Sequence, residues 1–92
     1  MLVFVDYAMC EYCAQELLNA FENNLPVDKA LKDNFLKSCS SLVTAHIKPG
    51  PKFFELWRFV NAKYLYEDHP KGFDLGAVTG ALEFYKSCME LE

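Results

Sequence analysis

Hydrophobic residues recur at steps of three and four along most of the chain, which is the spacing of one face of an α-helix. Strong helix breakers fall in only three places, at Pro26, at 49–51 and at 69–72, and they divide the chain into four pieces. The periodic stripe runs through the first, second and fourth pieces. The pattern therefore predicts helices over residues 3–23, 27–46 and 74–90.

The third piece also favours a helix. Its apolar residues gather on one helix face, Pro51 stands at a favoured first-turn position, and neither face of a strand would alternate cleanly with polar residues. We predict a helix over 52–67. Four large side chains fall outside the main apolar face and need another surface to cover them: Phe54, Phe59, Leu65 and Tyr66.

Charged residues support two of these helix starts. Asp28 lies near the start of the second helix, where the macrodipole favours an acid, and Asp74 is placed to cap the last one. Together the elements predict an all-α protein, with four to five helices in one small domain over 1–92.

Composition and charge narrow the classes of function. With 52% hydrophobic and 15% aromatic residues the chain is not disordered, and no run approaches the length of a membrane span. The net charge of -4 disfavours nucleic acid as a partner. Residues 1–25 contain no Lys or Arg, whereas residues 26–52 carry a local excess of Lys. Such a basic segment can bind the anionic headgroups of lipids.

Cysteine supplies the main candidate chemistry, at Cys10, Cys13, Cys39 and Cys88. A CxxC pair is compatible with a redox site, half of a zinc site or a disulfide framework. No metal site is predicted, because a zinc site usually has a second short-spaced pair and here the remaining ligands are isolated. The two histidines, His46 and His69, are expected at the surface, in a loop or at a helix end.

Two resemblances support a redox alternative with Cys10 and Cys13 as catalytic residues. Residues 2–5 followed by the CxxC resemble the opening of glutaredoxins and thioredoxins, and 10–17 with 60–61 resemble FAD-dependent sulfhydryl oxidases of the Erv type. A reactive thiolate needs a nearby cation, however, and acids surround the pair with no base before Lys29. We therefore predict that Cys10 is not an activated nucleophile.

The whole chain resembles saposin-like domains. The CxxC, the helix after it and the run through Cys39 to Leu42 are similar to their first half, and residues 59–63 with the segment ending at Cys88 are similar to their third and fourth helices. The family's fourth and fifth cysteines are missing. The resemblance implies a non-enzymatic lipid-binding or membrane-interacting module, without cofactor, that opens its helices to shelter acyl chains.

The resemblance also implies disulfides and a location. By position in the family, Cys10 would pair with Cys88, while Cys13 and Cys39 have lost their partners and are either buried thiols or a pair with each other. A saposin-like protein would be secreted or lysosomal, and one with reduced cysteines cytoplasmic.

The third predicted helix supplies the predicted contact surface. Its aromatic and apolar side chains are expected to face a lipid, a membrane or a protein partner, which includes a second copy in a homodimer. A small protein-interaction domain, in which this helix docks a partner, is the remaining alternative. The residues of this surface are Phe53, Phe54, Trp57, Phe59, Leu65 and Tyr66.

Overall fold

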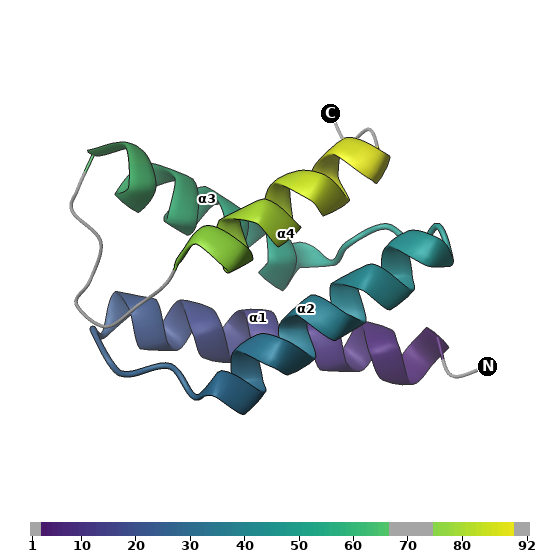
Figure 1. Ribbon diagram of the computed structural model, residues 1–92, viewed down its shortest axis with the longest axis horizontal. Coiled ribbons are helices and arrows are strands. Elements are labelled where there is room, and N and C mark those ends of the chain that lie inside the picture. Colours follow the sequence, from purple (N-terminus) through teal and green to yellow (C-terminus); the bar gives the residue numbers. More distant parts are fainter. Residues whose placement is uncertain (1–2, 67–74, 90–92) are drawn as a thin grey trace.

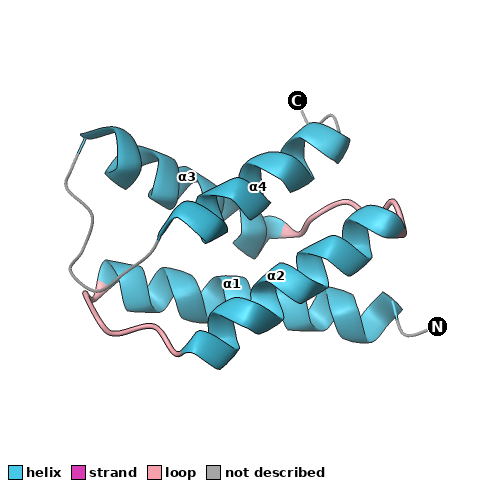
Figure 2. Cartoon of the chain, viewed as in Figure 1, coloured by secondary structure: helices cyan, strands magenta, loops and turns pink. Residues whose placement is uncertain are grey.

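The computed structural model describes the backbone of residues 3–66 and 75–89, and the side chains of 5–62 and 78–87. The chain forms four α-helices with no strand in these ranges (Figures 1 and 2). Their bounds are α1 Val3–Glu22, α2 Lys29–Thr44, α3 Pro51–Tyr66 and α4 Leu75–Met89. The predicted all-α bundle is confirmed, and each predicted helix end lies within two residues of the observed one.

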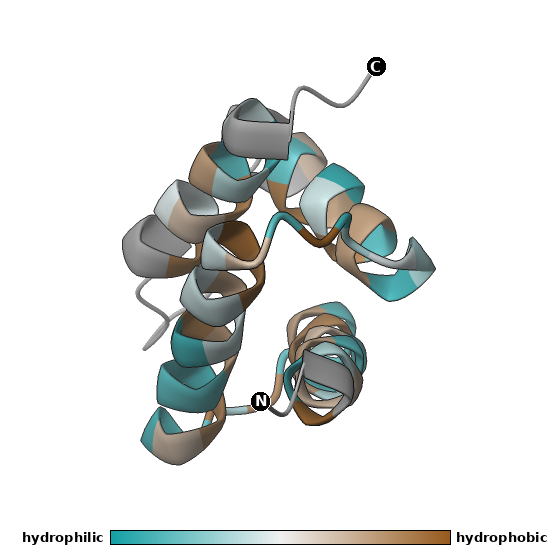
Figure 3. Cartoon of the chain, turned by 90° about the vertical axis from the view of Figure 1, so that its right-hand side faces the viewer, coloured by the Kyte–Doolittle hydropathy of each residue, from teal (hydrophilic) through white to brown (hydrophobic). Residues whose placement is uncertain are grey.

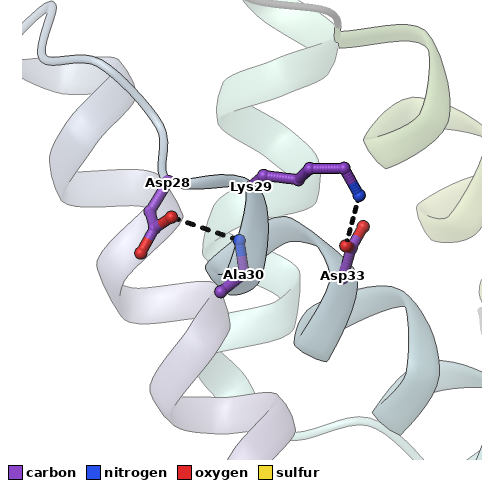
Figure 4. A network of polar contacts seen from close by, with 4 residues as sticks. All are labelled: Asp28, Lys29, Ala30 and Asp33. Carbon is purple, nitrogen blue, oxygen red and sulfur yellow. Dashed lines mark hydrogen bonds and ion pairs between the residues drawn. The ribbon is translucent and has the colours of Figure 1, made fainter.

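The start of α2 is stabilised by side chains close by in sequence (Figure 4). Asp28 is the N-cap, and its Oδ1 accepts a hydrogen bond from the backbone N–H of Ala30 at 3.2 Å. One turn further on, Lys29 and Asp33 form an exposed ion pair at 2.7 Å. Asp74, the predicted cap of α4, lies outside the described residues.

The ends of α1 and α2 share one type of cap. Asn24 and His46 each adopt φ 59°, and the N–H of the next residue reaches back to a carbonyl five residues earlier, from Leu25 to Ala20 and from Ile47 to Leu42. This is a Schellman motif, which turns the chain sharply away from the helix axis. His46 is exposed at this helix end, as predicted, and His69 lies outside the described residues.

The helices pack in a closed ring in the order α1, α2, α4, α3. The contact between α1 and α2 is the most extensive and that between α3 and α4 the least. In the described residues the backbones of α1 and α4 do not approach each other closely, and neither do those of α2 and α3. The molecule measures 38 × 27 × 18 Å, and its shortest dimension corresponds to about two helix diameters.

All four helices contribute to a single apolar core. Tyr85 of α4 is fully buried in it, with its ring 4.8 Å from that of Phe53 and its hydroxyl donating to the carbonyl of Ile47 at 2.5 Å. The other large core side chains are Leu17, Phe35, Leu42, Leu56, Val60, Val78 and Leu82.

Candidate functional site

The CxxC pair lies in the interior of α1 and faces the core. Cys10 and Cys13 are each 1% exposed. Because α1 begins at Val3, both residues lie well inside the helix, so the free amides of its first turn do not stabilise either thiolate. Residues 3–5 are helical, which contradicts the opening strand that a glutaredoxin-like fold requires.

Burial opposes ionisation of these thiols. It raises the pKa of Cys13 to about 11, and the neighbouring Cys10 and Glu16 add to the rise. At neutral pH the thiolate fraction of Cys13 is therefore on the order of one in ten thousand. A thiol that attacks a disulfide needs the opposite shift.

A third cysteine joins the pair from the neighbouring helix. Cys39 of α2 is 3% exposed, and its side chain is hydrogen-bonded to Cys10. This contact and burial raise its pKa, with Cys13 close enough to contribute. Burial also raises the pKa of Tyr85, and the neighbouring Cys10 and Cys39 add to that rise.

The predicted disulfides are not formed in this structure, where Cys10, Cys13 and Cys39 are thiols. Cys88 lies in the last turn of α4, but its side chain is outside the described residues. Pairing of Cys10 with Cys88 therefore stays a prediction, as does pairing of Cys13 with Cys39.

Glu11, between the two cysteines, caps a different helix. Its Oε1 accepts the backbone N–H of Lys52 at 3.1 Å, in the first turn of α3. The carboxylate lies over Gly50, where a Cβ would overlap Oε2 and come within 2.5 Å of the Tyr7 hydroxyl. Oε2 is buried without a hydrogen-bond partner in the part of the chain that is described. Glu11 thus acts on the α1–α3 contact rather than on the thiols.

The predicted contact surface on α3 is mostly covered. Phe53 is fully buried in the core, which corrects its assignment to a surface. Phe54, Trp57 and Phe59 are half-buried and pack against the core. Trp57 is also held by α4, because its Nε1–H donates to Glu83 at 3.2 Å and Lys86 lies 5.0 Å from the centre of its ring. The side chains of Leu65 and Tyr66 are outside the described residues.

Large exposed apolar side chains gather instead on the first half of α1. Val5 is 54% exposed, Met9 38% and Tyr12 60%, at helical steps of four and three residues. With the exposed Ala8 between them they form one stripe, which we name the α1 outer face. In Figure 3, where α1 is seen nearly end on, hydrophobic colour lies on its outer side as well as toward the other helices.

The sequence patterns did not identify two features of this region, the α1 outer face and the role of Glu11. The α1 outer face could have been found from the sequence, because α1 is apolar on both sides over its first half. A helix that is apolar all round is usually buried on every side by other parts of a protein or by a membrane. Glu11 left no signal in the sequence, because it and Lys52 are 41 positions apart and meet only in the folded chain.

The described residues hold no group of three or more His, Cys, Asp or Glu side chains arranged to bind a metal ion. In the same ranges, no helix combines the length and hydropathy needed to cross a bilayer.

The geometry thus provides a cluster of buried thiols and one exposed apolar stripe, with acids around the stripe. No protein-family model, curated protein or solved structure matches the chain.

Proposed function

We propose that this chain is a non-enzymatic helical interaction domain that docks a protein partner on the α1 outer face. The exposed stripe of Val5, Met9 and Tyr12 carries the proposal. Apolar side chains at steps of three and four residues are the pattern by which one helix docks against another. Water contact with these side chains is unfavourable, and a partner that covers them gains hydrophobic free energy.

Charge favours a protein over an anionic membrane as the partner. Helix α1 contains no Lys or Arg, and Asp6 and Glu16 lie beside the stripe. Helices that lie on anionic membranes usually carry Lys and Arg along their polar face. Acidic flanks instead complement a partner whose apolar residues are bordered by lysine or arginine.

The cysteines support a role without catalysis. Their burial, and the raised pKa of the Cys13 thiol, are typical of cysteines that pack as small apolar residues. The CxxC pair therefore contributes to the core that positions α1, and the redox alternative receives no support from its surroundings.

A lipid-binding module of the saposin-like kind is the second candidate. Trp57 favours it, because this half-buried residue contacts α4 across the least extensive helix contact of the ring. Separation of α3 from α4 would uncover Trp57 and the buried Phe53, and lipid chains would replace the helix contacts they lose.

Two synthetic peptides test the first candidate. Both have leucines at helical spacing, and their polar positions are all lysine in one and all glutamate in the other. We expect the lysine peptide to bind at least about tenfold more tightly. The double variant Met9→Ser/Tyr12→Ser should lose this binding, while Phe84→Ser, which removes an exposed apolar residue from α4, should retain it.

Vesicles and self-association separate the other outcomes. The chain has a single Trp, so a blue shift of its fluorescence with phosphatidylcholine or phosphatidylserine vesicles reports lipid contact at Trp57. Such a shift, without binding of the lysine peptide, would reject the protein-partner proposal in favour of the lipid candidate. Sedimentation that shows a dimer, lost in the Met9→Ser/Tyr12→Ser variant, would identify the partner as a second copy.

A further inference from the structure

The α1 outer face continues along the helix into polar residues. Glu16, Asn19 and Asn23 follow Tyr12 at steps of four, three and four residues, so they lie on the same side of α1. Asn19 and Asn23 are exposed, and a hydrogen bond of 2.9 Å joins their side chains. We name these three residues, with the exposed Glu22 at their side, the polar extension.

Negative charge gathers on the polar extension. Glu16 and Glu22 form no ion pair with another described residue. The last turn of α1 contains no base, and the helix macrodipole adds a partial negative charge at this end. Asp6, beside the apolar residues, lies in the first turn, where the positive end of the macrodipole offsets its charge. The attraction for a cation is therefore strongest beyond Tyr12.

The α1 outer face and the polar extension are long enough to contact different turns of one partner helix. From Val5 to Asn23 the row is about 27 Å long, at 1.5 Å per residue. Two helices that cross at about 20° stay in contact over several turns, and a partner of about five turns then covers the whole row. The α1 outer face contacts one half of such a helix, and the polar extension contacts the other half.

We propose that the partner segment is an amphipathic helix whose contact face is divided along its length, with apolar residues in one half and Lys or Arg in the other. This arrangement rests on the proposed function, and it specifies where along the partner the charges lie. The apolar half covers Val5, Met9 and Tyr12, and the basic half pairs with Glu16 and Glu22. A basic residue placed over the apolar side chains would lose water without gaining an acidic partner, which is unfavourable.

Two helical peptides of identical composition test the division. Both carry leucines on the contact face of one half. In the divided peptide, lysines occupy the contact face of the other half. In the bordered peptide, the same lysines flank the leucines, and glutamines take the positions they left. Fluorescence anisotropy at low salt should show at least about fivefold tighter binding of the divided peptide, the gain expected from two exposed ion pairs.

Two charge variants locate the source of this preference. Glu16→Gln/Glu22→Gln should bring the two affinities together by weakening the divided peptide. Asp33→Asn/Glu55→Gln removes two exposed charges from α2 and α3 instead, and it should keep the fivefold ratio. Because every variant is measured with both peptides, a difference in helix content between the peptides cancels. If circular dichroism shows that the first variant does not fold, the wild-type ratio decides, since the preference should disappear at high salt.

The outcomes separate the divided partner from the docking role itself. Equal binding of both peptides to the wild-type chain, lost in Met9→Ser/Tyr12→Ser, would overturn the divided partner and keep the proposed function. A preference that persists in Glu16→Gln/Glu22→Gln, or that is insensitive to salt, would also overturn it. Binding of neither peptide would reject the proposed function and the divided partner together.

Discussion

At the scale of single residues, Gly50 shows how a missing side chain makes room for another one. Position 50 precedes the first residue of α3, where a Ser, Thr, Asp or Asn often caps the helix. Gly50 has no such group, and Glu11 of α1 supplies the acceptor for the Lys52 N–H instead. The carboxylate reaches that N–H only because no Cβ stands in its path.

A pair of glycine substitutions tests this arrangement. Gly50→Ala should lower the free energy of unfolding by about 1 kcal/mol or more, because the new methyl group displaces Glu11 from its hydrogen bond. Gly80→Ala should raise it by about 0.5–1 kcal/mol, because Gly80 lies inside α4 with nothing within 4 Å of the new carbon. Urea unfolding of both variants measures the difference. Equal and small effects would show that Glu11 does not cap α3.

At the scale of elements, α2 has both of its ends within the described residues, and local contacts fix each end. Asp28 accepts a hydrogen bond at its start, and a Schellman motif around His46 closes its end. The other polar pair of its first turn, Lys29 with Asp33, is exposed to solvent, which weakens the attraction between the two charges.

Two aspartates of α2 allow a direct comparison. Asp28→Ala should lower the free energy of unfolding by about 1 kcal/mol, because the Ala30 N–H loses its acceptor. Asp33→Ala should have a clearly smaller effect, since it breaks only an exposed ion pair. Thermal unfolding in low salt and in high salt checks both, and only the Asp33→Ala effect should shrink with salt. An Asp33→Ala loss as large as that of Asp28→Ala would contradict the capping role.

At the scale of the whole molecule, Tyr85 links α4 to the rest of the fold. The backbones of α4 and α1 do not approach each other closely in the described residues, yet Tyr85 shares the buried core with Cys10 and Cys39 and lies close enough for both to raise its pKa. Its hydroxyl donates to the carbonyl of Ile47 in the segment between α2 and α3, and its ring packs on Phe53. One side chain therefore connects α4 with α3 and with the end of α2.

Removal of one hydroxyl group tests this link. Tyr85→Phe should lower the free energy of unfolding by about 1 kcal/mol, because the Ile47 carbonyl loses its donor while the packing of the ring is kept. The matched variant Tyr12→Phe, on an exposed tyrosine, should leave stability nearly unchanged. Denaturant unfolding of the two variants provides the comparison. If Tyr85→Phe is neutral as well, the hydrogen bond contributes nothing to holding α4.

The sequence alone determined the class of fold and the bounds of its helices. Apolar periodicity, Pro51 and the breakers between the pieces act over a few residues, so their effects can be derived from the order of residues. The tertiary structure decided which side chains face one another. It placed Phe53 in the core, left Tyr12 exposed, buried Cys39 in the same cluster as Cys10 and Cys13, and set Glu11 over Gly50. Those outcomes depend on how whole helices rotate and cross as they bury their apolar faces, and such long-range packing leaves no local pattern in the chain.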